Sequence, residues 1–340
     1  MPSATGNPAA IRLLTSAEDA ALITEFCVQA DVTEATRIKY RAHLAEFSRW
    51  LQHPQTIATD GSGLAHATRA NVARYMAYLL IGDRYAASEY GKPRTTLAAS
   101  SRKSVLGSLH AFYRYLVYVE LAPHNPADGL PRPTQKQRRG LHLTADELRR
   151  LLDVRGSARD RVQVYLLAYT AARVGEIRNL RWQDVDLAER TLALRTKGDR
   201  QRVIDIHPRL MSELRRWFLY VDHMAERNPD FRAAMADPLH DYVLLTRSGR
   251  QLSPTTIYKQ LKRRAVHAGL YELEPGHREH RSLVSPHTLR RTFATLLLND
   301  GHHLDAVADV LGHESVDTTR KHYAFSSNAR RRATIEAFNV

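Results

Sequence analysis

Residues 285–301 read SPHTLRRTFATLLLNDG, and residues 310–323 read VLGHESVDTTRKHY. The first stretch predicts an α-helix from about Thr288 to Asp300, because its apolar run stops at Gly301 and glycine is favoured just past a helix end. The second stretch begins where a further short helix is expected to end, at a Leu-Gly-His sequence. The C-terminal part of the chain is therefore expected to be mainly α-helical.

Composition and charge limit the class of protein. A chain of 340 residues with 43% hydrophobic residues is large enough for two domains that each bury a core. Lys and Arg number 50 against 36 Asp and Glu, so the formal net charge is +14 and the isoelectric point is near 10.0. This excess predicts a polyanionic partner, nucleic acid first and an anionic membrane surface second.

Cysteine content and hydropathy favour a location inside the cell. The single cysteine, Cys27, excludes an intrachain disulfide and a cysteine-cluster zinc site, which fits a reducing cytoplasm. Apolar runs such as VYLLAY at 164–169 are far shorter than the roughly 18 residues that span a bilayer. The N-terminus also lacks the features of a secretory signal. We expect a cytoplasmic, nucleoid-associated protein with no membrane partner.

A composition break divides the chain near residue 130. Residues 123–140 contain four prolines and two glycines without apolar periodicity, which predicts an extended linker. The predicted domains cover residues 1–122 and 141–340. Residues 1–130 carry 13 basic and 11 acidic residues, so +12 of the net charge falls in the rest of the chain.

The N-terminal domain is expected to be a helical bundle. Apolar residues at helical spacing mark one face over residues 40–51 and another over 105–116, and Thr68 caps a shorter helix expected at about 69–80. Basic residues on the opposite faces either bind DNA or form solvated helix surfaces. The candidate DNA-binding residues of this domain are Arg37, Lys39, Arg41, Arg102 and Lys103.

The C-terminal domain is expected to combine helices with a small β-sheet. A capping box at Thr144 predicts a helix through Leu152, and a longer helix is expected from about Arg159 to Leu180. The other expected elements are a β-hairpin over 191–206 with Lys197 at its turn, a strand at 242–246, and helices that begin at Pro208 and Pro254.

One of these helices is a candidate for reading DNA. After Pro254 it carries Lys259, Lys262 and Arg263 on one face, which could enter a major groove or line phosphates. A solvated run of charges is an equally good interpretation.

Arginine and histidine occur in two local contexts that suit an anionic ligand. Arg173 lies in the apolar segment YTAARVGEI, where a buried guanidinium needs a partner, and a plain salt bridge to Glu176 is the simpler interpretation. His287 stands just ahead of a helix whose first turn carries Arg290, an arrangement that suits phosphate. A helix cap beside a solvated arginine is the alternative.

The order of these motifs matches a known family. The order Arg, hairpin Lys, His-x-x-Arg, Leu-Gly-His and Tyr resembles that of the tyrosine recombinase (phage integrase) family. The stretch HTLRRTFATLLLNDG with VLGHESVDTTRKHY looks like the C-terminal signature of this family. ATRIKYRAHLAEFSRWL is similar to the start of its core-binding domain, and NPADGLPRP followed by LTADEL resembles its interdomain linker and the entry to its catalytic domain. Five elements in order make the match highly specific.

The resemblance implies a fold, a reaction and an assembly. It implies a helical-bundle (SAM-like) core-binding domain and a mainly α catalytic domain with a small β-hairpin. The implied enzyme cuts and rejoins double-stranded DNA at specific sites through a 3′-phosphotyrosyl intermediate, as a homotetramer on paired sites and without a cofactor. Too few residues precede the first strong helix for a further arm-binding domain, which favours a simpler Xer-like or transposon-encoded enzyme.

The chemistry asks for these residue types on physical grounds. Tyr323 would be the nucleophile, because a phenolate can both attack phosphorus and leave it. Arginine forks suit the non-bridging oxygens of the transition state, and Lys197 could protonate the departing 5′ oxygen. His287 and His313 could move the tyrosine proton or hydrogen-bond the phosphate, in either order. The candidate catalytic residues are Arg173, Lys197, His287, Arg290, His313 and Tyr323.

Two departures and several alternatives accompany this interpretation. Ala171 stands where the family often has glycine, and Tyr323 follows His313 by ten residues, with His322 in the neighbouring slot. A metal site is the rival use of histidine, but neither His277 with His280 nor His302 with His303 has carboxylate or cysteine partners at ligand spacing. The rival functions are a topoisomerase-like nicking and closing enzyme, and a DNA-binding regulator on a degenerate recombinase scaffold.

The end of the chain is expected to take part in assembly. Ile335 and Phe338 lie three residues apart in ATIEAFNV, a segment that looks helical and has too few apolar residues to form a core alone. In the family such a tail packs into the neighbouring protomer; folding back on its own domain is the alternative.

Overall fold

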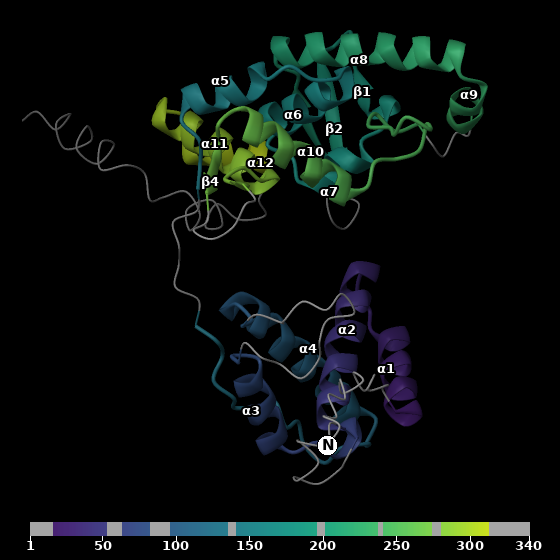
Figure 1. Cartoon of the computed structure of the whole chain (residues 1–340), viewed down its shortest axis with the longest axis vertical. Helices are drawn as coiled ribbons and strands as arrows, with labels where there is room; N and C mark the ends of the chain where they lie inside the picture. Colours follow the sequence, from purple (N-terminus) through teal and green to yellow (C-terminus); the bar gives the residue numbers. More distant parts are fainter. Residues whose placement is uncertain are drawn as a thin grey trace, which may run out of the picture. The chain divides into compact units, whose positions relative to one another are not determined.

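The computed structural model describes residues 16–52, 63–81, 96–134, 141–195, 201–236, 241–273 and 280–312. The chain divides into two compact units, Met1–Arg138 and Arg139–Val340 (Figure 1). Each has its own hydrophobic core. Within the described residues, none of the helices combines the length and hydropathy that crossing a bilayer requires.

The N-terminal unit is a bundle of helices around an aromatic core. Its helices are α1 (Ala17–Gln29), α2 (Glu34–Leu51), α3 (Arg69–Tyr78) and α4 (Ala99–Tyr118), with a 3-10 turn at Leu64–His66. Phe47, Tyr75 and Phe112 are each fully buried, and the ring centroids of Phe47 and Tyr75 lie 4.8 Å apart. The apolar faces predicted over residues 40–51 and 105–116 supply this core, so the periodicity correctly predicted a helical bundle.

The chain that leaves α4 continues to pack on the N-terminal unit. Ala122 and Ala127 are buried in its core, and His110 of α4 pairs with Asp128 at 2.8 Å. The first half of the stretch that the sequence assigned to an extended linker, which includes the buried Ala127, is therefore folded onto the bundle.

The C-terminal unit surrounds the buried helix α6 with other helices. Its helices are α5 (Ala145–Asp153), α6 (Ala158–Thr170), α7 (Val174–Asn179), α8 (Pro208–Arg227), α9 (Pro229–Met235), α10 (Pro254–His267), α11 (Pro286–Asn299) and α12 (Leu304–Leu311). Helix α6 packs against α5, α8, α10 and α11 (Figure 1). Most of its residues are buried, which explains its apolar sequence.

Two small antiparallel sheets complete this unit. One has the order β1 (Val185–Asp186), β2 (Thr191–Arg195) and β3 (Gln201–Asp205), and the other pairs β4 (Tyr271–Leu273) with β5 (His280–Ser282). The pairing of β2 with β3 is the hairpin that the sequence predicted. The mainly α fold class with a small β-hairpin is therefore correct.

Two expected elements were wrong. The helix expected from Arg159 to Leu180 is divided, because Ala171 adopts the left-handed conformation (φ 50°, ψ 23°) and ends α6 before α7 begins. The strand expected at 242–246 forms only isolated bridges, at Tyr242 and at Leu245. Its apolar run, Val243 to Leu245, is fully buried beside Leu180 and Leu252, so the run indicated burial and not a strand in a sheet.

Candidate active site

The left-handed turn at Ala171 places Arg173 at the surface of the C-terminal unit. Arg173 is the N-cap of α7, and its side chain is 44% exposed, in contrast to the buried position that its apolar surroundings predicted. Its Nη1 donates to Glu176 Oε1 at 2.8 Å, and its backbone N–H donates to Glu176 Oε2 at 2.9 Å. The salt bridge considered from the sequence is therefore present, and it orients an exposed arginine.

Arg290 is buried and is held by backbone carbonyls. It lies in the first turns of α11, where Ser285 and Thr288 form a capping box, and it is 4% exposed. Nη1 donates to the Ala171 carbonyl at 2.7 Å, and Nη2 donates to the Leu311 carbonyl at 2.6 Å. The solvated arginine considered as an alternative is excluded. These carbonyl acceptors aim the guanidinium without cancelling its charge.

His287 lies close to both arginines. Burial lowers the pKa of its imidazole from the usual value, and the positive charges of Arg290, Arg173 and Arg291 lower it further. The lowered pKa favours the neutral ring, which can accept a proton or a hydrogen bond. The structure thus brings together Arg173, His287 and Arg290 from two elements separated by more than a hundred residues.

A third arginine belongs to this cluster and was missed by the sequence analysis. Arg202 of β3 donates from Nη2 to Glu176 Oε2 at 2.9 Å and from Nη1 to the Val310 carbonyl. Glu176, which is 6% exposed, therefore accepts from two different arginines. The detectable signal was a charge two residues before the buried Ile204 on a strand, where the core-facing side normally carries an apolar residue.

Gly312 ends α12 at the edge of the described residues. It has a positive φ of 64°, which glycine adopts without strain, and it closes the helix through a hydrogen bond to the Asp309 carbonyl. The remaining catalytic candidates, Lys197, His313 and Tyr323, lie outside the described residues, as does the C-terminal tail.

The basic residues of α10 are divided between the surface and the core. Lys259, Lys262 and Arg263 are exposed. Their neighbour Arg264 is 5% exposed and donates to the carbonyls of Leu151, Leu152 and Val154. Arg264 therefore holds the C-terminal end of α5 and belongs to the fold.

The exposed face of α10 borders a polar cavity of about 450 Å³. Arg263 also pairs with Asp160 of α6 at 3.6 Å. The basic side chains lining the cavity are Arg159, Arg247, Lys259 and Arg263. These side chains come from three parts of the chain, so the basic patch is larger than the run of charges on α10 alone indicated. Such a patch suits binding to an anionic surface.

The basic candidates of the N-terminal unit are mostly exposed. Lys39, Arg41 and Lys103 project to solvent. Arg37 is partly buried and contacts Glu34 at 3.4 Å, while Arg102 donates to the Leu97 carbonyl at 3.2 Å. The last two have structural partners, so their charges are held close to the bundle.

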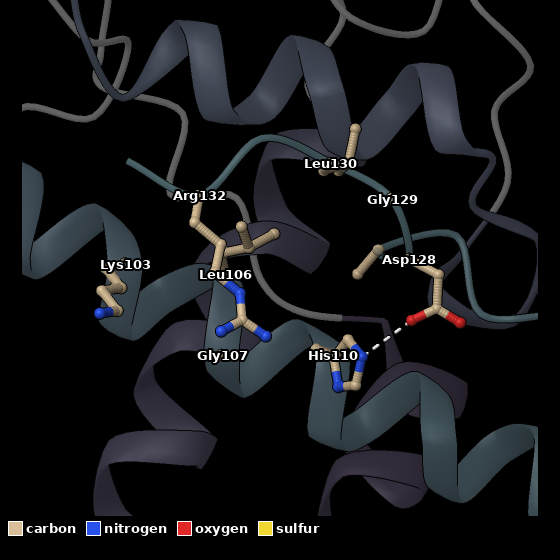
Figure 2. A pocket seen from close by; sticks show the side chains of 9 residues that line it. Lys103, Leu106, Gly107, His110, Asp128, Gly129, Leu130 and Arg132 are labelled. Atoms are coloured by element: carbon tan, nitrogen blue, oxygen red, sulfur yellow. Dashed lines mark ion pairs between the residues drawn. The ribbon is translucent and has the colours of Figure 1, made fainter. Parts of the chain in front are cut away.

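A second cavity, of about 310 Å³, lies on this unit. Figure 2 shows His110 of α4 reaching Asp128, on the segment that also carries Arg132, and Lys103 of the same helix lines the cavity as well. The ion pair between His110 and Asp128 joins the two walls of the cavity. Its remaining basic side chains, Lys103 and Arg132, give it a positive rim.

Histidine pairs were the alternative metal candidates. Across the described ranges, no three histidine, cysteine or carboxylate side chains gather as metal ligands would. His277 lies outside those ranges.

Comparison with known proteins places this geometry in a family. Residues 142–330 match the model of the phage integrase family. The chain is 32% identical to the tyrosine recombinase XerC of Alcanivorax borkumensis over 64% of this chain and 66% of that protein. It is 26% identical to a tyrosine recombinase of Pseudothermotoga lettingae over 81% of this chain and 91% of that protein.

Solved structures show the same fold at low sequence identity. XerH recombinase bound to a palindromic difH substrate aligns with a TM-score of 0.65 at 19% identity, over 93% of this chain and 83% of that one. A lambda integrase dimer bound to a COC′ core site aligns with a TM-score of 0.61 at 16% identity, over 89% and 94%.

The chain belongs to the phage integrase family. It is a tyrosine recombinase, an enzyme of site-specific recombination that works through a covalent tyrosine intermediate.

Proposed function

We propose that this enzyme cleaves and rejoins double-stranded DNA at specific sites with Tyr323 as nucleophile and with Arg173 and Arg290 as the phosphate-binding groups. The observation that carries the proposal is the convergence of Arg173, His287 and Arg290 around one point of the catalytic unit. Arg173 and Arg202 share the Glu176 carboxylate, and Arg290 donates to two carbonyls, so the three arginines and Glu176 together carry a formal charge of +2. A pentacoordinate phosphate needs compensation of this size.

Each proposed step conserves atoms and charge. The Tyr323 oxygen attacks the scissile phosphorus and forms a phosphotyrosyl bond, while the bond from phosphorus to the 5′ oxygen breaks. Lys197 gives a proton to that oxygen, and His287 or His313 receives the proton of the tyrosine. A neutral His287 is ready to accept it. Rejoining reverses these transfers, with the 5′ hydroxyl as nucleophile.

We propose further that charges outside the active site bind the DNA backbone. The exposed residues Lys259, Lys262 and Arg263 of α10 would line phosphates beside the basic cavity, and Lys39, Arg41 and Lys103 would do so on the N-terminal unit. Arg37 and Arg102 would contribute charge from fixed positions.

The biological setting is part of the same proposal. The enzyme would act in the cytoplasm, associated with the nucleoid, as a homotetramer on paired sites. Residues 331–340 would pack into a neighbouring protomer. Deleting residues 331–340 is expected to leave single-site binding nearly intact and to reduce synapsis and recombination. Recombination of paired sites at the normal rate by the truncated protein would contradict the exchange.

The nucleophile can be tested with a nicked suicide substrate in EDTA. Wild type is expected to form a covalent protein–DNA adduct, and Tyr323→Phe to form none, because phenylalanine lacks the attacking oxygen. Tyr118→Phe is the matched control, since Tyr118 is 82% exposed on the N-terminal unit and should react normally. An adduct with Tyr323→Phe would assign the reaction to another residue, and an adduct lost in EDTA would support metal catalysis.

A further inference from the structure

The structure assigns Arg202 a role that rests on the proposed function: we propose that it is a positioning residue that fixes Arg173 and the C-terminal end of α12 for cleavage. The connection of Arg202 to the proposed phosphate site runs through neighbouring groups. It reaches that site through the Glu176 carboxylate on one side and through the Val310 carbonyl on the other.

The carboxylate of Glu176 joins the two arginines closely. Its Oε1 accepts from Arg173 Nη1 at 2.8 Å, and its Oε2 accepts from the Arg173 backbone at 2.9 Å and from Arg202 Nη2 at 2.9 Å. Loss of Arg202 would leave one oxygen held by a single backbone donor. The carboxylate could then rotate, and the exposed guanidinium of Arg173 would lose its fixed direction.

The other end of Arg202 holds the helix that precedes the Leu-Gly-His sequence. Arg202 and Arg290 donate to consecutive carbonyls of α12, those of Val310 and Leu311. Both guanidinium groups stabilise this helix end, because its carbonyls carry partial negative charge. A Cβ added to Gly312 would lie 2.7 Å from Arg202 Cδ, so the glycine also leaves room for the arginine.

The fold alone does not require an arginine at this position. Arg202 lies on the same face of β3 as the buried Ile204, and its side chain is only 9% exposed. Burial lowers the pKa of its guanidinium, and Arg173 lowers it further, while Glu176 opposes both effects. An apolar side chain would avoid this desolvation cost. The arginine is therefore best explained by what it connects.

The test compares two substitutions of Arg202 with a matched control on the neighbouring strand. Arg202→Met removes both connections, and Arg202→Lys keeps the charge but loses the two-pronged geometry. Arg195→Met is the control, because Arg195 of β2 pairs with Asp184 at 2.9 Å and is 42% exposed. Adduct formation on a suicide substrate is measured at saturating protein, together with DNA affinity and thermal melting.

We expect Arg202→Met to slow cleavage by about 10- to 100-fold, with DNA affinity within about twofold of wild type, because misplacing a group in the site has effects of this size. Arg202→Lys should fall between Arg202→Met and wild type, and Arg195→Met should cleave normally. In an Arg173→Ala background, Arg202→Met should cost less than it does in wild type, because one of the two groups that it positions is already gone and only its contact with α12 remains.

The following outcomes would overturn the proposal, and the lysine variant decides if the methionine variant does not fold. Folded Arg202→Met protein that cleaves at the wild-type rate, or a full additional loss in the Arg173→Ala background, would contradict positioning through Glu176. If Arg202→Met does not fold, the lysine variant decides by its rate and by the same double-mutant comparison. If neither variant melts cooperatively, Arg202 is a folding residue only. If wild type itself forms no adduct, the proposed function fails and the role of Arg202 falls with it.

Discussion

The basic residues around the proposed phosphate site and the exposed ones of the N-terminal unit are held in different ways. In the C-terminal unit, the side chain of Arg202 is 9% exposed and Arg290 is 4% exposed. Carbonyl or carboxylate acceptors fix both guanidinium groups. In the N-terminal unit, Lys39, Arg41 and Lys103 extend into solvent. A fixed cation can stabilise a transition state, because its direction is set before the reaction. A mobile one mainly adds to DNA affinity, in proportion to the phosphates neutralised.

The strongest test of this difference is Arg290→Gln. The substitution removes the buried charge and weakens the bonds to the Ala171 and Leu311 carbonyls. We expect single-turnover cleavage to fall by about 10³-fold, the upper range for loss of one electrostatic group, and the melting temperature to fall as well.

The matched control for Arg290 is Arg41→Gln on the N-terminal unit. Arg41 is exposed, so its substitution should leave cleavage at saturating protein unchanged and should weaken binding slightly. Equal losses of cleavage rate in the two variants would remove the distinction between fixed and mobile cations.

The same difference explains what the sequence could predict. The helices of the N-terminal unit were visible because apolar residues such as Leu44 and Leu109 recur at helical spacing and are buried. Those of the C-terminal unit were visible from start signals such as Thr144, Pro208 and Pro254. The order of motifs identified Arg173, His287 and Arg290 as a set. The environment of each was less predictable: Arg173 was expected to be buried and is exposed, while a solvated Arg290 was an open alternative and it is buried.

The reason is that local sequence does not encode long-range partners. The exposure of Arg173 depends on the left-handed Ala171, a conformation that alanine rarely adopts and that periodicity cannot reveal. The carbonyl that holds Arg290 at Leu311 is supplied by a helix formed later in the chain. Arg202 had a local signal, a charge on the inward face of a strand, but its partners appear only when α7 and α12 meet β3.

Two adjacent arginines of α10 allow the comparison to be made within one helix. Arg263→Gln should reduce the slope of log affinity against log salt by about 0.9, the contribution of one phosphate contact, with little change in melting temperature. Arg264→Gln should lower the melting temperature and leave the salt slope nearly unchanged. It leaves the carbonyls of Leu151, Leu152 and Val154 without their donor, at a cost of about 1–3 kcal/mol or more. A lower salt slope in Arg264→Gln alone would reverse the assignment.

Acid should destabilise the C-terminal unit through His287. The folded protein lowers the pKa of this imidazole by burial and by the neighbouring arginines, so the unfolded chain binds the proton more tightly. Stability should therefore fall as the pH drops below the usual histidine value of about 6.5 and should level off below the lowered pKa. His287→Gln should show a smaller fall, measured as melting temperature between pH 7.5 and 5.

His43 and His207 also have pKa values lowered by burial and provide the background for this measurement. They should keep their contribution in the His287→Gln variant. A pH dependence identical to wild type would show that His287 does not titrate between these values.

The smallest expected effect concerns Ala171, where the family often has glycine. Ala171 has a positive φ of 50°, which costs alanine about 1–2 kcal/mol, and glycine would remove this strain. Glycine would also lose a buried methyl group among Ala294, Leu298 and Leu311, worth about 0.8 kcal/mol, and would add about 0.5–1 kcal/mol of backbone entropy to the unfolded chain. These contributions nearly cancel.

Ala171→Gly should therefore change the free energy of unfolding by less than about 1 kcal/mol in denaturant titrations. The variant should also cleave at close to the wild-type rate, because the carbonyl of residue 171 still accepts from Arg290. A tenfold slower cleavage with unchanged stability would show that the methyl group, and not only the carbonyl, fixes the direction of the buried arginine.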